Sequence, residues 1–467
     1  MPDSNDTNEH TIPSLLEQLQ NEDQSIVHNA LLEISALCQR SSPMHRINLV
    51  RLNGVDIIIS FLQTTENTTF INIALIILLN VATLENDEEL NVAYSGFLDL
   101  IPSLFQIGDL EIMKNIIWCL ANVSATSSDD REYICSQTSL LDKFVTYIRL
   151  DTPFLHPLLF FYRNMLNDRE SGQIFNPILI PIQKLVSSMT DYSAFLSIPR
   201  IDSTILKSPL DDAMSIIHGL IGPIFDRTRL LMESSFLTDC KKFLTDPRYA
   251  LEHYAVTRTL YRLTFIDYPD VSPSYIADLF ESSSTAATVF HTLQQSSLTI
   301  QDGGSDGVFF FCLRMIVNLI CSSDSLALSF LNADLITILQ NVLSNVHQKI
   351  YTEIMYVFTN LSDCSVDVVL KTLITGNIPC YLAHFLGRIT NAHDLATLLC
   401  SVERFAIISK RSAQISEIAH LQLDSTFFQQ AAESDLPNMV SSLISHKDEK
   451  VKHFAEKAFT ALTNFEK

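Results

Sequence analysis

The chain has 467 residues, 47% of them hydrophobic and 18% charged, which supplies a large buried core and excludes a mainly disordered protein. Its net charge of −22 argues against nucleic acid as a partner and favours basic ligands, although an acidic surface can also serve solubility alone. Only eleven residues are glycine, about a third of the usual ~7%, which disfavours the turns and phosphate loops of sheet-based enzymes.

Residues 1–12 are expected to form a short polar tail. The opening residues MPDSNDTNEH are acidic and lack the apolar run of a signal peptide. Later apolar stretches, such as 71–84, are too short to cross a bilayer or contain a polar residue midway. We therefore expect no membrane insertion and a location in the cytoplasm and nucleus.

From residue 13 onward the sequence repeats itself. Three apolar segments align without gaps and carry an asparagine at the same place, at Asn80, Asn122 and Asn164, so that the interval is 42 residues. Asn318 and Asn360 repeat this interval further along the chain. A fixed period of this length is typical of helical repeat proteins, and it predicts that the five asparagines share one face.

A second marker is in phase with the asparagines. A glycine precedes an apolar run at Gly54, Gly96 and Gly376, and Thr138 and Ala333 stand at its place in two further copies. Glycine suits a sharp turn after a helix because it adopts left-handed backbone angles without strain. Each unit is therefore predicted to be a short helix, a turn, a second helix and a longer third helix with the asparagine.

Weaker copies of the third helix occupy the rest of the chain. They place other residues near the asparagine position: Cys38, His218, Arg262 and Arg404. About ten units result, which predicts one continuous repeat domain over 13–467. Two intervals are too long, and we predict loop insertions near 183–209 and 282–307, where serine, threonine and turn formers are frequent.

No motif in the sequence predicts catalysis, a metal or a cofactor. The nine cysteines contain no C-x-x-C pair and indicate free thiols in a reducing compartment. Residues 303–307 match the G-x-S-x-G motif of hydrolases, but no strand precedes them as that motif requires. We expect a binding protein that is not an enzyme.

The repeat, its glycine turn and its third-helix asparagine resemble armadillo repeats, most closely those of importin alpha. The segment IIWCLANVSA, with Trp118 and Asn122, is similar to that family's W-x-x-x-N array, and ITGNIPCYLAHFL and LRMIVNLI are similar to its later repeats. The likeness covers nearly the whole chain but is specific at few positions. It implies an all-α, right-handed superhelical solenoid of about ten armadillo repeats, with three helices and about 42 residues each.

The resemblance also implies a concave groove lined by the third helices. In the family, asparagines hydrogen-bond the backbone of an extended nuclear-localisation peptide, and tryptophans four residues earlier hold its lysine stems. An amide side chain pairs with any backbone amide, and an indole attracts cations. Carried over to this chain, the groove residues are Asn80, Trp118, Asn122, Phe160 and Asn164 in the larger site, and Arg314, Asn318, Tyr356 and Asn360 in the smaller one.

The chain departs from the family pattern in two respects. Trp118 is its only tryptophan, and Ile76 and Arg258 stand at two of the tryptophan positions. The basic segment that recruits the importin-beta carrier in the family has no counterpart in residues 1–12. We expect a weaker or altered preference for lysine-rich signals and, for any importin-beta-like carrier, a non-standard route of recruitment.

Two functions are compatible with this pattern. The first is an importin-alpha-like adaptor that binds basic nuclear-localisation peptides for import into the nucleus. The alternative is a general armadillo scaffold for protein–protein interaction outside nuclear import. The acidic charge favours the adaptor, because catenin-type grooves are typically basic. The asparagines and aromatic residues also have a purely structural interpretation, which the sequence leaves open.

Overall fold

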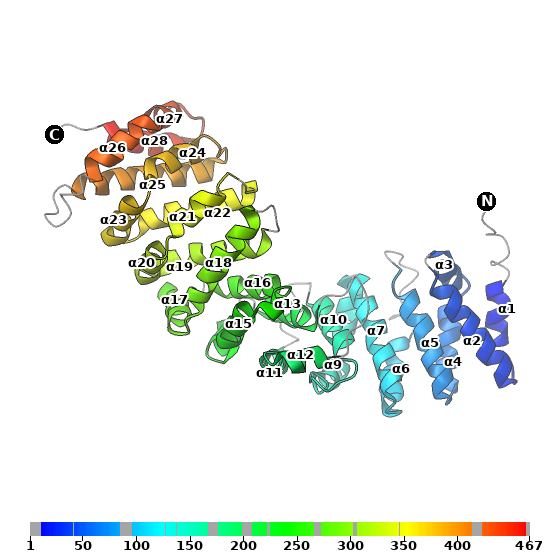
Figure 1. Cartoon of the computed structure of the whole chain (residues 1–467). Helices are drawn as coiled ribbons and strands as arrows, with labels where there is room; N and C mark the ends of the chain where they lie inside the picture. Colours follow the sequence, from blue (N-terminus) through cyan, green and yellow to red (C-terminus); the bar gives the residue numbers. More distant parts are fainter. Residues whose placement is uncertain are drawn as a thin grey trace. The chain divides into compact units, whose positions relative to one another are not determined.

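The computed structural model describes residues 11–40, 42–84, 96–126, 128–136, 138–166, 176–198, 208–221, 225–265, 272–301, 306–344, 346–412 and 423–463. Every regular element in these ranges is a helix, in the order α1 to α28 with two 3-10 turns among them (Figure 1). The chain forms two compact units, Met1–Phe236 and Leu237–Lys467. The prediction of an all-α fold is confirmed.

Unit 1 is a row of long third helices, each packed on the next, with shorter helices beside them. The third helices are α2 (Gln24–Cys38), α5 (Thr68–Val81), α7 (Leu110–Thr126), α10 (Leu155–Met165) and α13 (Pro209–Leu220). The shorter helices are α1 (Thr11–Gln18), α3 (Met44–Arg51), α4 (Gly54–Thr64), α6 (Phe97–Gln106), α8 (Ser128–Ser136), α9 (Thr138–Val145), α11 (Leu179–Ser188), α12 (Tyr192–Ser197) and α14 (Phe225–Met232).

Unit 2 has the same construction, again with each third helix packed on the next. Its third helices are α16 (His253–Thr264), α19 (Gly307–Ser322), α22 (Gln348–Asp363), α25 (Ala392–Ser412) and α28 (Glu449–Thr463). Its other helices are α15 (Phe236–Thr245), α17 (Pro273–Ser282), α18 (Thr285–Gln301), α20 (Asp324–Asn332), α21 (Leu335–Val342), α23 (Val366–Thr375), α24 (Ile378–Leu386), α26 (Leu423–Glu433) and α27 (Leu436–Leu443). The described residues thus contain ten third helices, which agrees with the predicted number of repeats.

The third helix α10 is buried on nearly every side because neighbouring helices surround it. In α10, nine of eleven residues are buried, and only Phe160 and Arg163 are partly exposed. A helix that is hydrophobic almost all round has to lie within the core. The burial leaves α10 one narrow accessible strip, and the candidate site lies on the partly exposed strips of α10 and the other third helices.

The prediction that glycine supplies a left-handed turn between the first and second helices is correct at only one of the three glycines. Gly96 adopts the expected left-handed conformation, with φ +80°. Beside Gly54 the left-handed residue is Asn53 instead, with φ 53°, and Gly376 has an extended φ of −146°. A Cβ on Gly54 would lie 2.4 Å from Cδ1 of Leu49. Glycine is therefore required at Gly54 by close packing and not by backbone conformation.

The predicted loop insertions are largely helical where the structure describes them. Residues 282–307 contain α18, the second helix of its repeat, and 183–209 include the end of α11 and all of α12. Serine and threonine suggested loops, but in α18 the hydroxyls of Thr292 and Ser296 donate to backbone carbonyls of their own helix. Residues 199–207 and 302–305 lie outside the described residues, as does the predicted tail up to residue 10.

Within the described ranges, no single helix has both the length and the hydropathy that crossing a membrane requires. Two adjacent pairs reach these values only when taken together, α20 with α21 and α23 with α24. Each pair is sharply bent at its junction, by 66° and 89° respectively.

Candidate partner-binding face

We call the partly exposed strips of the third helices the third-helix face. Eight of the nine residues predicted to line a groove lie on it, whereas Asn164 is buried, with 4% of its surface exposed. The unit 1 part of the face contains Asn80, Trp118, Asn122 and Phe160. The unit 2 part contains Arg314, Asn318, Tyr356 and Asn360.

The asparagines form a hydrogen-bonded ladder between consecutive third helices. In three of them, Nδ2 donates to the carbonyl of the residue just before the asparagine of the preceding repeat. These pairs are Asn122 with Leu79 at 2.8 Å, Asn164 with Ala121 at 2.9 Å, and Asn360 with Val317 at 3.0 Å. The ladder therefore fixes the position of one third helix against the next.

The other two asparagines use their amides differently. Nδ2 of Asn80 donates to the carbonyl of Ile76 in its own helix, at 2.7 Å, and Nδ2 of Asn318 donates to Oγ1 of Thr264 at 3.1 Å. An amide has two N–H donors and an acceptor oxygen, so one internal bond leaves the rest of its capacity for a ligand. One N–H of each asparagine therefore has a structural role within the chain. The role of the asparagines in peptide binding stays a prediction.

In unit 1, two aromatic side chains of the face contact each other. The rings of Trp118 and Phe160 meet edge to face with centroids 5.8 Å apart. The guanidinium of Arg163 lies 4.8 Å from the centroid of Phe160. The Phe160 ring thus already has a cation of the same chain against it, while Trp118 remains partly exposed.

A buried charge cluster holds that arginine in place, and sequence reasoning missed it. Asp212 is fully buried, with Oδ1 2.5 Å from NH1 of Arg163 and Oδ2 3.7 Å from Nε2 of His156. Asp212 lies on α13, whereas both partners lie on α10. No local spacing could have indicated this cluster, because only the packing of α10 on α13 brings the three residues together.

In unit 2, Arg314 is also held within the chain. Its Nε lies 3.0 Å from Oε1 of Glu353, and its guanidinium lies 4.8 Å from the ring centroid of Tyr261 and 5.4 Å from that of Phe310. Tyr356 donates its hydroxyl to Oδ1 of Asp394 at 2.6 Å. The predicted smaller site is therefore a network of internal contacts that joins α16, α19, α22 and α25.

This network makes the protonation of Glu353 depend on folding. Burial raises the pKa of Glu353, and the nearby charge of Asp394 raises it further, while Arg314 opposes both. A raised folded-state pKa means that the native state binds the proton more tightly, so stability is lost as pH rises through that pKa. As the pH is lowered from 7 to 4, we therefore expect the free energy of unfolding of wild type to increase relative to that of Glu353→Gln. Urea unfolding of both proteins measures it. A constant difference between the two proteins would contradict this.

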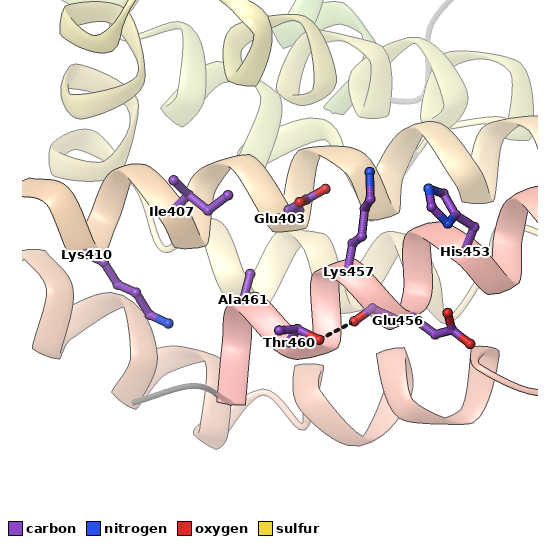
Figure 2. A pocket seen from close by; sticks show the side chains of 8 residues that line it. All are labelled: Glu403, Ile407, Lys410, His453, Glu456, Lys457, Thr460 and Ala461. Carbon is purple, nitrogen blue, oxygen red and sulfur yellow. Dashed lines mark hydrogen bonds between the residues drawn. The ribbon is translucent and has the colours of Figure 1, made fainter. Parts of the chain in front are cut away.

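The last two third helices of unit 2, α25 and α28, line an open surface hollow of about 450 Å³ (Figure 2). Its charged lining residues have both signs. The cation Lys410 lies 5.2 Å from the ring centroid of Phe428, and Lys457 lies 5.7 Å from that of Phe454. The lining residues are Glu403, Ile407, Lys410, His453, Glu456, Lys457, Thr460 and Ala461. The mixed charge favours no single class of ligand.

Comparison with known proteins bears on the fold. No family model matches the chain, and no curated protein sequence matches it. An engineered protein, Northeast Structural Genomics Consortium target OR497, has a similar structure, with a TM-score of 0.71 and 14% identity over 97% of this chain and 98% of its own. The fold is an all-α solenoid of repeated helical units.

Other similar structures include armadillo-repeat proteins. A designed armadillo repeat protein in complex with the peptide (KR)4 is 16% identical, with a TM-score of 0.45 over 54% of this chain and 99% of its own. A structure from work on the interaction between cadherin and beta-catenin is 11% identical, with a TM-score of 0.49 over 97% of this chain and 94% of its own.

Proposed function

We propose that this armadillo-type chain is a non-enzymatic scaffold that binds extended segments of partner proteins along its third-helix face. The observation that supports this is that equivalent residues of adjacent third helices are 42 positions apart. Phe160 follows Trp118 at this interval, and Asn122 follows Asn80. Packed helices lie about 8–10 Å apart, and an extended chain advances about 3.3 Å per residue. A strip that recurs with each helix therefore suits a ligand that meets one repeat every two to three residues.

In unit 1 the face offers groups suited to such a ligand. The half-buried indole of Trp118 gives a flat apolar wall and a cation-attracting surface, and Phe160 supports it from the next repeat. One turn further, Asn122 retains an N–H and its oxygen after its bond to Leu79. Backbone pairing to the amide together with side-chain packing on the indole would hold a segment without requiring one sequence.

A narrower candidate is an adaptor that carries basic nuclear-localisation segments between cytoplasm and nucleus, with an importin-beta-like carrier. Trp118 beside Asn122 and the net charge of −22 favour it. The internal arginines argue against it, because Arg163 lies over Phe160 and Arg314 lies between Tyr261 and Glu353. We therefore propose the scaffold as the main function and restrict binding of basic segments to the strip around Trp118.

The first test is binding of fluorescently labelled (KR)4 to the full chain, measured by anisotropy. We expect Trp118→Ala to weaken binding by about tenfold, which corresponds to about 1.4 kcal/mol, because the lysine and arginine stems lose their aromatic wall. Leu251→Ala is a suitable control, since Leu251 is 91% exposed and lies outside the face. If binding weakens with salt but is unchanged in Trp118→Ala, the peptide is held only by the general negative charge of the protein. That result would exclude the adaptor function.

The scaffold proposal has its own test. A displayed library of random peptides is selected on the wild-type chain, and the enriched peptides are then compared on wild type, Trp118→Ala and Leu251→Ala. We expect enriched peptides whose binding is lost on substitution within the third-helix face and kept in the control. If no peptide is enriched, or if every enriched peptide binds the variants equally well, the proposed function is wrong.

A further inference from the structure

Two neighbouring third helices of unit 2 are positively charged, although the chain as a whole is acidic. The whole sequence has 53 acidic and 31 basic residues, yet α16 and α19 contain no aspartate or glutamate. They carry three arginines, Arg258 and Arg262 on α16 and Arg314 on α19. Arg258 and Arg262 are one helical turn apart, so they lie on the same side of α16, and both are partly exposed.

These arginines differ in what they contact. Arg314 is neutralised by Glu353 and is therefore unavailable to a partner. Arg258 has no carboxylate partner among the residues that the structure describes. A guanidinium is always charged and presents a planar fork of donors that matches a carboxylate. Arg258 is thus a cation with unused donors on a helix that contains no carboxylate, while the nearby Glu353 of α22 is already paired with Arg314.

Aromatic rings surround this position. Tyr254 and Phe265, near the two ends of α16, are 42% and 56% exposed. Phe311 on α19 lies 5.4 Å from Tyr254 and 5.7 Å from Tyr261, measured between ring centroids, and it joins the two helices. We define the arginine–aromatic surface as Tyr254, Arg258, Arg262, Phe265 and Phe311.

We infer that the arginine–aromatic surface binds a carboxylate-rich, extended segment of a partner protein, a charge preference opposite to that of the Trp118 strip in unit 1. This inference rests on the proposed scaffold function and specifies one of its ligand classes. A carboxylate of the segment pairs with Arg258, and its apolar or aromatic side chains cover Tyr254 and Phe265. A basic segment finds no carboxylate on α16 or α19, and the nearby aromatic slot already holds Arg314.

The negative charge of the whole chain does not prevent this binding. At physiological ionic strength the Debye length is about 8 Å, so carboxylates on more distant helices are largely screened. A contact within a partly buried aromatic surface is screened much less. The local sign of the surface therefore decides which segment binds there.

The test compares two labelled probes on the full chain in about 0.15 M salt, a condition that keeps the Debye length near 8 Å. The probes are (EY)4, an octapeptide of alternating glutamate and tyrosine, and (KR)4. We expect (EY)4 to bind, Arg258→Glu to weaken its binding at least tenfold, and Arg258→Lys to weaken it less because the charge remains. Binding of (KR)4 is expected to be unchanged or stronger in Arg258→Glu.

Arg248→Glu is the matched control, because Arg248 is exposed, lies outside the surface and pairs with Asp246. It should leave (EY)4 binding unchanged, and circular dichroism should show the same helix content in all variants. If (EY)4 does not bind wild type, or if it binds Arg258→Glu as well as it binds wild type, the inference is overturned. The scaffold proposal would still hold in that case if peptides selected from the library lose binding on substitution in the unit 1 part of the third-helix face. If no peptide binds at all, both the scaffold proposal and this inference are wrong.

Discussion

Replacing Asp212 by alanine is expected to lower the free energy of unfolding by about 3–5 kcal/mol, the usual cost of removing one partner from a buried ion pair. Asp212 is fully buried, lies 2.5 Å from Arg163 and lies 3.7 Å from His156, which is itself 3% exposed. Without the carboxylate, a largely buried guanidinium loses its only close counter-charge among the described residues. Urea unfolding of wild type and variant, followed by circular dichroism, measures the difference.

The matched control is Asp226→Ala in the same unit. Asp226 also pairs with an arginine, Arg229, at 3.3 Å, but the two side chains are 79% and 50% exposed. Exposed ion pairs contribute about 0–1 kcal/mol, so this substitution should be nearly neutral. Equal losses for Asp212→Ala and Asp226→Ala would show that burial of the cluster does not determine its contribution.

Asn164→Ala is expected to lower the free energy of unfolding by about 1–2 kcal/mol, the cost of a lost buried hydrogen bond and of a small cavity. The amide of Asn164 is buried between α10 and α7 and donates to the carbonyl of Ala121 at 2.9 Å. The same urea unfolding experiment measures this loss.

Asn80→Ala is the control for the ladder. Among the described residues the side-chain amide of Asn80 bonds only to the carbonyl of Ile76 in its own helix, and alanine has a higher helix propensity, by up to ~0.7 kcal/mol. Asn80→Ala should therefore be neutral or slightly stabilising. If both substitutions cost the same, the ladder does not stabilise the packing between repeats.

The repeat architecture was predictable because each repeat contacts mainly its neighbours, so a local pattern that recurs every 42 residues is sufficient to specify it. The asparagine register identified third helices on both units, and eight of the nine groove candidates lie on the partly exposed strip. The loop prediction over 282–307 was wrong, since composition does not show that hydroxyls such as Thr292 are satisfied inside a helix.

The sequence by itself determined the all-α repeat fold, the length of the unit and, for most of the third helices that carry the asparagine, the side that stays accessible. Only the tertiary structure decided the chemistry of that accessible side. Asn122 bonds to Leu79, 43 residues away, and Arg163 pairs with Asp212, 49 residues away. Periodicity reports which positions of a helix are buried, but the axial offset between two packed helices decides which donor meets which acceptor. That offset results from the packing of whole side-chain surfaces, which no spacing within one helix specifies.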